Sequence, residues 1–401
     1  MKKFSYVAKN DESEIKKGFF EAETKEELIQ ALRKQKMTAI TIKEAAPNPF
    51  SKLGDFGYVS STEKVMFSKE LATMVSAGIP IIQAIHILED QSASPKLKKA
   101  TNQIAQDIEG GVSLSAAMEK HPSVFSPLYI NMVKAGEIGG MLDDTLEKMA
   151  EEIEKEHELV ASVRGAMTYP AVIMLVMVGV VIYLLTNTIP KISAVFSDLG
   201  GDLPASTKFL LFLSDSLQSY GLFIGVFFAG LFFGARFLLK QNIKIRYMWH
   251  SVLLKIPVFG KLIKKINITR FTRTLGSLLS SGVAVLEAID ISSNILKNEV
   301  FKKEIKEASD KVQNGSSLSE PLKESKVFPI MVSQMIAVGE DTGTIDKVLL
   351  KLTNFYQKEV DHTVKNLSSL LEPVMMIIIG AGAGFIVISI ITPIYSMADL
   401  F

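Results

Sequence analysis

Three stretches of the chain contain no Asp, Glu, Lys or Arg: residues 165–190, 216–235 and 373–398. A helix needs roughly 20 apolar residues to cross the hydrocarbon core of a bilayer. Each stretch reaches that length, and uncharged runs this long are unusual in the cores of globular proteins. We therefore predict three transmembrane helices in preference to three buried core helices.

Outside these stretches, apolar residues recur at helical spacing and are interrupted by Gly or Pro. Gly78 suits the left-handed residue that closes a helix, and Pro80 suits the first position of the next one. We expect a bundle of about six helices whose last member continues into the first span. In the first block these helices cover residues 62–77, 80–89, 95–108, 113–120, 126–135 and 141–163.

The amino-terminal residues 1–46 have a different pattern. FSYVA and KGFFEA are typical of short strands, and TAITIKEA, with its alternating β-branched residues, predicts a third. Between them, TKEELIQALRKQK predicts a helix capped by Thr24. The sequence therefore indicates a small α+β module, followed at 47–61 by a linker rich in Pro, Gly and Ser.

The chain contains an internal repeat. FSKELATMVSAGIPIIQAIHI, from Phe67, aligns with FTRTLGSLLSSGVAVLEAIDI, from Phe271, at a shift of 204 residues. After one deletion the shift is 203, and AGEIGG at 135–140 aligns with VGEDTG at 338–343. The prolines at the two ends of a span also align, Pro170 with Pro373 and Pro190 with Pro393. The duplicated unit therefore includes its transmembrane helix.

These patterns divide the chain into eight parts. We expect the α+β module (1–46), linker (47–61), first cytoplasmic bundle (62–164), first span (165–190), an extracytoplasmic loop (191–215), second span (216–235), a basic segment with the second cytoplasmic bundle (236–371), and third span (372–398). The fold class is mainly α.

Charge sets the expected orientation. The chain has 44 Lys and Arg against 43 Asp and Glu, which does not favour a nucleic-acid-binding protein. Residues 236–273, however, hold ten basic residues and no acidic one. Basic segments next to spans stay on the cytoplasmic side and attract anionic lipid. We therefore predict a cytoplasmic amino terminus and an extracytoplasmic carboxyl terminus.

Sequence signatures of catalysis are absent. The chain has no GxxxxGK[ST] loop, no HExxH motif and no cysteine, and its five histidines are scattered without ligand spacing. Ser113 and Ser317 have no recognisable His and acid companions, so we interpret both as helix N-caps. We predict no enzymatic activity, cofactor or metal.

The paired segments FSKELATMVSAGIPIIQAI and RFTRTLGSLLSSGVAVLEAI resemble the inner-membrane platform family of type II secretion and type IV pilus machines. So do AGEIGG and VGEDTG, DLPASTKFL after the first span, and IPVFGKLI after the second. The resemblance covers nearly the whole chain. It implies a non-enzymatic scaffold in the bacterial inner membrane and a homo-oligomer. The implied partners are a hexameric assembly ATPase on the cytoplasmic side, pilin-like subunits and other inner-membrane assembly proteins.

The repeated turn contributes the candidate partner or turn positions, which are Gly136, Glu137 and Gly140 with Gly339, Glu340 and Gly343. In the structural interpretation, which we favour, the first glycine of each copy has a positive φ at a helix end and the last starts the next helix. Each glutamate then interacts with a helix amino terminus. In the functional interpretation, the glutamates contact basic residues of the ATPase or of a second protomer.

The cytoplasmic entrances of two spans contribute the candidate membrane-edge positions, which are Tyr169, Pro170, Glu372 and Pro373. The prolines predict a kink or a helix start, and we expect Glu372 to pair with a basic residue of this chain. GxxxG pairs begin at Gly221, Gly230 and Gly380, and they predict packing between the second and third spans; contact with a pilin helix is the alternative.

An oligomeric transporter or channel is the competing function, suggested by the repeat and the spans. Ion-coupled transport usually needs ionisable groups within the membrane. The three uncharged stretches contain no Asp, Glu, Lys, Arg or His, and Glu372 lies at the cytoplasmic edge of the third. The sequence leaves open whether the two bundles pack on each other.

Overall fold

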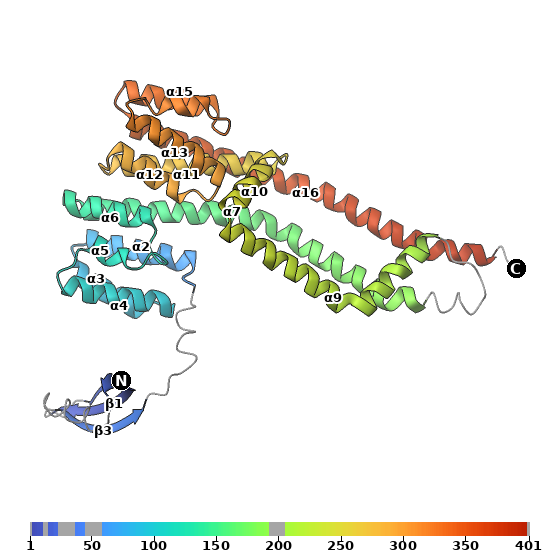
Figure 1. Ribbon diagram of the computed structural model, residues 1–401, viewed down its shortest axis with the longest axis horizontal. Helices are drawn as coiled ribbons and strands as arrows, with labels where there is room; N and C mark the ends of the chain where they lie inside the picture. Colours follow the sequence, from blue (N-terminus) through green and yellow to red (C-terminus); the bar gives the residue numbers. More distant parts are fainter. Residues whose placement is uncertain (1, 11–14, 23–36, 45–57, 192–204, 399–401) are drawn as a thin grey trace.

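The computed structural model describes residues 2–10, 15–22, 37–44, 58–191 and 205–398. The fold is mainly α, with two repeated helical bundles and three long apolar helices that extend away from them (Figure 1). The expected helix after Thr24 and most of the expected linker lie outside the described residues.

Three strands form the amino-terminal sheet: β1 (Lys2–Asn10), β2 (Ile15–Ala22) and β3 (Met37–Glu44). Their order is β2-β1-β3, and both pairings are antiparallel. The register shifts between Val7 and Ala8 in the pairing of β1 with β3. The central strand is therefore the first in the sequence, and the third returns along its free edge.

The first bundle has the six helices that the sequence predicts. They are α2 (Ser61–Ser76), α3 (Ile81–Gln91), α4 (Pro95–Glu109), α5 (Leu114–Glu119), α6 (Pro127–Gly139) and α7 (Leu142–Tyr183). Serine hydroxyls of Ser60, Ser94 and Ser126 accept backbone N–H groups at the starts of α2, α4 and α6. Such caps satisfy donors that the first turn leaves unpaired, which explains why each helix begins there.

The second bundle repeats this order. It comprises α11 (Phe259–Ser280), α12 (Val285–Ile295), α13 (Glu299–Gln313), α14 (Ser319–Glu324), α15 (Ile330–Asp341) and α16 (Ile345–Ala398). An additional short helix, α10 (Ile243–Lys255), precedes it and follows α9 (Ala205–Gln241).

In each repeat the last helix of the bundle continues without a break through an apolar segment. Pro170 lies in the interior of α7 and Pro373 in the interior of α16, so neither proline starts a helix. The far end of α7 passes into a π-helical segment, Leu184–Thr188. α9 begins at Ala205, so residues 205–215, which we expected within a loop, are helical.

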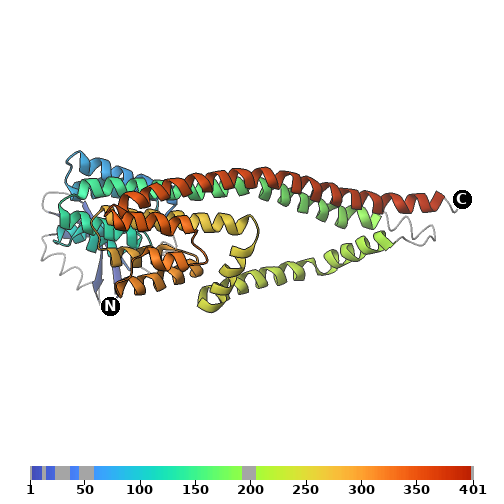
Figure 2. The same cartoon turned by 90° about the horizontal axis from the view of Figure 1, so that it is seen from above.

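Near the end farthest from the bundles, α9 contacts both α16 and the π-helical segment that follows α7 (Figure 2). The Thr207 hydroxyl donates to the carbonyl of Ser389 at 2.7 Å, and the Ser214 hydroxyl donates to that of Leu185 at 2.6 Å. The GxxxG glycines behave differently, since a Cβ added at any of them would meet no atom within 4 Å. The expectation that these motifs pack the second span on the third is wrong, because the helices approach elsewhere.

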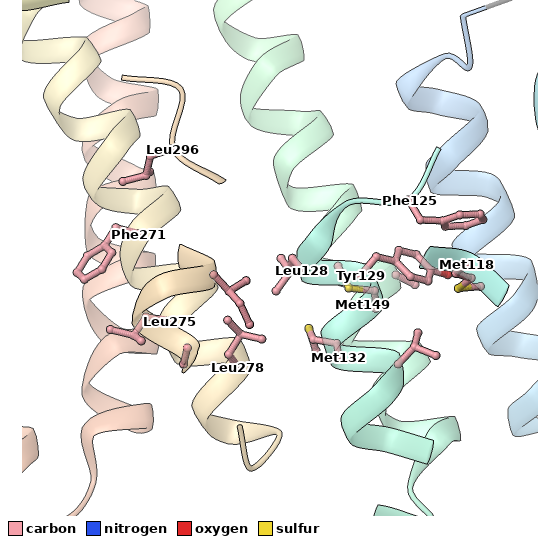
Figure 3. Close-up of a cluster of buried hydrophobic side chains, with 14 of the residues drawn as sticks. Met118, Phe125, Leu128, Tyr129, Met132, Met149, Phe271, Leu275, Leu278 and Leu296 are labelled. Atoms are coloured by element: carbon pink, nitrogen blue, oxygen red, sulfur yellow. The ribbon is translucent and has the colours of Figure 1, made fainter. Parts of the chain in front are cut away.

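The two bundles share one continuous hydrophobic core. α6 of the first bundle contacts α11 and α12 of the second, and Leu128, Met132 and Leu278 are buried members of the same cluster (Figure 3). The repeats therefore pack on each other within one chain, which the sequence had left undecided.

Candidate functional site

The repeated turn places a carboxylate at a helix start in both copies. Glu137 accepts the backbone N–H of Leu114 at 2.6 Å and that of Ser115 at 3.2 Å, at the start of α5. Glu340 accepts the N–H of Leu318 at 2.6 Å and that of Ser319 at 3.1 Å, at the start of α14. Negative charge is favourable there because first-turn N–H groups lack helical partners. Each glutamate thus fastens a short helix to the helix that precedes the turn.

The glycines of this turn act differently from the expectation. Gly140 and Gly343 have φ of 65°, and Gly140 is the left-handed C-cap of α6 rather than the start of the next helix. Gly136 and Gly339 are buried within helices without a positive φ. A Cβ at Gly136 would lie 2.7 Å from the Thr145 Oγ1 atom. The first glycine of each copy therefore permits close helix packing, and the last permits the reversal.

Ser113 and Ser317 differ although they are equivalent in the repeat. The Ser113 hydroxyl accepts the N–H of Ala116 at 3.3 Å and caps α5, as predicted. Ser317 is not the N-cap of α14, because Leu318 has that place, and its hydroxyl instead contacts the Ser319 hydroxyl at 2.6 Å. The prediction for Ser317 is wrong, because α14 begins at Ser319, one position later in the repeat than the start of α5 at Leu114.

The four membrane-edge residues lie on α7 and α16, and they do not converge on one site. Tyr169 is exposed and Pro170 is buried, whereas Glu372 and Pro373 are both exposed. In the part of the chain that the structure describes, Glu372 forms no ion pair. The expected partner for this carboxylate is therefore not found among the described residues.

A charged network between the bundles was missed by the sequence analysis. Arg270 Nη2 lies 2.5 Å from Glu156 Oε1, and Arg273 Nε lies 3.8 Å from Glu152 Oε1. Arg273 also donates through Nη2 to Gln357 Oε1 at 2.6 Å. The two arginines come from α11 of the second bundle and the two glutamates from α7 of the first. These side chains therefore join the repeats at the base of the long helices.

Burial dominates the electrostatics of this network. Glu152 is 9% exposed and Arg273 is 3% exposed. Loss of solvent raises the pKa of Glu152 to about 7, although the positive charge of Arg273 opposes the rise. Glu152 lies on the part of α7 before the apolar segment 165–190. The contact between the bundles thus contains a carboxyl group that titrates near neutral pH.

Beside the network is a cavity of about 230 Å³ between the bundles. Phe67 and Phe125 line it from the first bundle, and Thr274 and Ile295 from the second. Its lining is mostly apolar, and Glu152, Glu156 and Arg270 of the network also line it. Among the residues that the structure describes, no group of three or more His, Cys, Asp or Glu side chains could hold a metal ion.

No local signal in the sequence identifies this network. Arg273 aligns in the repeat with Lys69, whose side chain is 48% exposed and pairs with Glu154 on the surface. Lys69 and Arg273 occupy the same position in the repeated sequence pattern. Arg273 is buried because α11 faces the other bundle at this position, and the sequence pattern does not reveal that.

Comparison with known proteins agrees with the duplicated architecture. The family model for type II secretion system protein F matches twice, at residues 67–190 and 271–393, and the model for its N-terminal domain matches residues 1–43. The two matches cover the two repeats, each with one of the long apolar helices.

Relatives match over nearly their whole length. The type IV pilus assembly protein PilC of Myxococcus xanthus is 35% identical over 98% of this chain and 95% of its own, and PilC of Thermus thermophilus is 37% identical over 98% of each. The type II secretion system protein F of Vibrio cholerae is 30% identical over 100% of this chain and 99% of its own. With both repeats and the amino-terminal domain matched in order, this chain belongs to the type II secretion system protein F family, which includes the PilC proteins.

Proposed function

We propose that this protein is the inner-membrane platform scaffold of a type IV pilus or type II secretion machine, and that it couples a cytoplasmic hexameric ATPase to the insertion of pilin or pseudopilin subunits. One observation carries the proposal: in each repeat, a single helix runs from a packed bundle through an apolar segment. A continuous helix can transmit displacement along its length, although Pro170 in α7 and Pro373 in α16 each remove one backbone hydrogen bond. Force applied to the bundles would therefore reach the membrane.

The apolar faces of the three long helices support a role in contacting other membrane proteins. Their most apolar windows are at most 6% buried within this chain. Small-residue motifs such as Gly221-x-x-x-Gly225 allow a second helix to approach closely, and among the described residues no atom lies within 4 Å of a Cβ added at either glycine. A pilin-like helix or a second copy of this protein would fit there, so we propose a homo-oligomer with open span faces.

We place the two bundles in the cytoplasm, with the amino terminus inside and the carboxyl terminus outside. The ten basic residues between Arg236 and Arg273 support this orientation, and they would also attract anionic lipid and favour retention at the inner leaflet.

For the repeated turn, the hydrogen bonds of Glu137 and Glu340 to backbone N–H groups support a structural role. The ATPase would then contact exposed residues next to these glutamates. One of them is Ile138, which is 80% exposed. Substitution of Glu137 by Gln separates the two roles. Lost stability indicates the structural role, and normal stability with lost ATPase binding indicates docking.

The direct test is gentle detergent extraction of the tagged protein from its native membrane, followed by mass spectrometry of the proteins that copurify. We expect an assembly ATPase and pilin-like subunits, and the identity of the pilins would distinguish a pilus from a secretion system. Recovery of small-molecule transport proteins in their place, under conditions that preserve other complexes, would overturn the proposal. The competing transporter function has no specific support, because residues 165–190, 216–235 and 373–398 contain no Asp, Glu, Lys, Arg or His.

A further inference from the structure

The short helix α10 lies between the second long helix and the second bundle. Only Asn242 separates the end of α9 from the start of α10, and the Asn242 side chain accepts the N–H of Lys244 at 2.9 Å, so α10 begins with a capped turn. In Figure 2, α10 runs across the direction of the long helices, at the level where they leave the bundles. A helix in that place and direction would lie parallel to a membrane that the long helices cross.

One face of α10 is fixed to the second bundle. Arg246 Nη2 lies 2.6 Å from Glu299 Oε1, and the backbone N–H of Glu299 donates to His250 Nδ1 at 3.1 Å. Lys303 Nζ lies 5.7 Å from the ring centre of Tyr247. These contacts all involve the start of α13 and define which side of α10 faces the protein.

The opposite face is apolar and exposed. Met248, Trp249, Val252 and Ile256 are 63%, 50%, 50% and 38% exposed, and they recur at the spacing of a single helical face. Lys244 and Lys255 lie beside this face and are exposed. An apolar face that contains a tryptophan and is flanked by lysines is typical of a helix at a membrane interface.

The turn that follows α10 holds it at this angle. Val258 has φ of 66° and ψ of −60°, and the N–H of Phe259 donates to the carbonyl of Pro257 at 2.8 Å, which defines a γ-turn. A Cβ added at Gly260 would lie 2.3 Å from the carbonyl oxygen of Leu254. The backbone of α11 therefore packs directly on the end of α10, and this packing restrains the angle between the two helices.

We propose that α10 lies in the cytoplasmic headgroup region of the membrane, with Met248, Trp249, Val252 and Ile256 inserted at the acyl boundary and Lys244 and Lys255 on anionic headgroups. The short distance between the apolar part of α9 and the start of α10 supports contact with lipid. The apolar surface of α9 continues through Phe237 and Leu238, which are 59% and 54% exposed. Three residues then lead to Asn242, a rise of about 5 Å, which is within the thickness of the headgroup layer.

The positive charge of this segment also supports contact with lipid. The chain has no Asp or Glu between Arg236 and Arg273, so no acidic side chain of this segment would oppose contact with anionic lipid. The inference rests on the membrane location in the proposed function. It does not depend on the identity of the ATPase or the pilins.

The only tryptophan of the chain is Trp249, so its fluorescence reports on α10 in the full-length, unlabelled protein. The experiment is reconstitution into vesicles of phosphatidylcholine mixed with phosphatidylglycerol, with bromine placed either near the headgroup end or near the centre of the acyl chains. We expect shallow bromine to quench roughly half of the fluorescence, and central bromine and aqueous iodide to quench little, because interfacial helices insert about 5–10 Å. Iodide quenching without bromine quenching would overturn the proposal.

Two relocated tryptophans calibrate the measurement in a Trp249→Phe background. Phe223→Trp places the probe within the second predicted span, and Tyr58→Trp places it before the first bundle, where Tyr58 is 81% exposed. We expect the first to be quenched by central bromine and the second by iodide alone.

Lys244→Gln with Lys255→Gln tests the headgroup contact. We expect quenching of Trp249 to depend on phosphatidylglycerol in the unsubstituted protein and to lose that dependence in the double variant. If the thiol of Trp249→Cys is protected from a maleimide in native membranes but labelled in vesicles that contain only this protein, a protein partner covers this face and the lipid proposal is wrong. Loss of ATPase and pilin copurification would leave the quenching result unchanged, so failure of this proposal is distinguishable from failure of the proposed function.

Discussion

Glu152 of α7 and Arg273 of α11 are buried opposite each other, with 3.8 Å between Oε1 and Nε, although they belong to different copies of the repeat. Arg273 directs its hydrogen bond from Nη2 to Gln357 of α16. One guanidinium thus contacts both helices that continue toward the membrane. A displacement of one bundle against the other would have to break this contact.

The first prediction concerns pH. The folded-state pKa of Glu152 is raised to about 7, above the ordinary value of 4.5, so the folded protein binds the proton more tightly than the unfolded chain does. The contribution of Glu152 to the free energy of unfolding is therefore largest below pH 4.5, and it is lost as pH rises toward 7. Relative to Glu152→Gln, the unsubstituted protein should lose at most about 3 kcal/mol of unfolding free energy across this range.

Thermal unfolding in detergent, followed by far-ultraviolet circular dichroism, would measure this difference. The groups that act on Glu152 are Arg273, Glu156, Lys155 and Ser277, and they are unchanged in the variant. Parallel pH profiles of the two proteins would show that folding does not raise the pKa of Glu152.

The second prediction concerns the ion pair between Arg270 and Glu156. In a double-mutant cycle with Arg270→Met and Glu156→Gln, we expect a coupling energy of about 1 kcal/mol or more, because Arg270 is mostly removed from solvent. Lys155 and Glu151 form a matched control within α7, and both are more than half exposed. Their coupling should be about 0.3–0.5 kcal/mol. Equal coupling energies in the two cycles would show that burial between the bundles does not strengthen the ion pair between Arg270 and Glu156.

The third prediction concerns the repeated glutamate. Glu137→Gln and Glu340→Gln should each lower the unfolding free energy by about 1–2 kcal/mol, because one amide oxygen replaces two charged acceptors at a helix start. Asp341→Asn is the control, since it removes an adjacent exposed carboxylate. The structural role is refuted if both glutamine variants unfold at the same temperature as the control.

The fourth prediction separates the two glycines of each turn. Gly339→Ala should cost about 1–3 kcal/mol, because the new Cβ would lie 2.9 Å from the backbone Cα of Ile345. Gly343 has φ of 65°, and a Cβ added there would meet no atom within 4 Å. Gly343→Asn should therefore cost much less, because Asn tolerates left-handed backbone. A larger loss of stability for Gly343→Asn would contradict the assignment of packing to the first glycine.

The fifth prediction concerns orientation. Because the chain contains no cysteine, Lys191→Cys and Lys261→Cys each introduce a single thiol, and both positions are exposed. A membrane-impermeant maleimide should label Lys191→Cys in spheroplasts, and Lys261→Cys only after permeabilisation. The opposite labelling pattern would reverse the proposed topology.

The sequence by itself determined the helices, the duplication and the three apolar segments, because these depend on the spacing of apolar residues along the chain. Gly78 and the helices on either side of it were predicted correctly, since a left-handed residue between two helices is a local requirement. The roles of Gly136 and Gly140 were predicted wrongly. Gly140 is the left-handed residue, and Gly136 lies within α6 against Thr145, a contact between helices that spacing does not reveal.

Only the tertiary structure decided how the repeats pack. Lys69 and Arg273 are equivalent basic positions, yet Lys69 forms a surface ion pair and Arg273 is buried against the other bundle. The same holds for α10, because its contacts with α13, including the ion pair between Arg246 and Glu299, decide which of its faces is covered by protein. Burial depends on which helices meet in space, and a pattern repeated in one chain cannot specify which of its two copies faces inward.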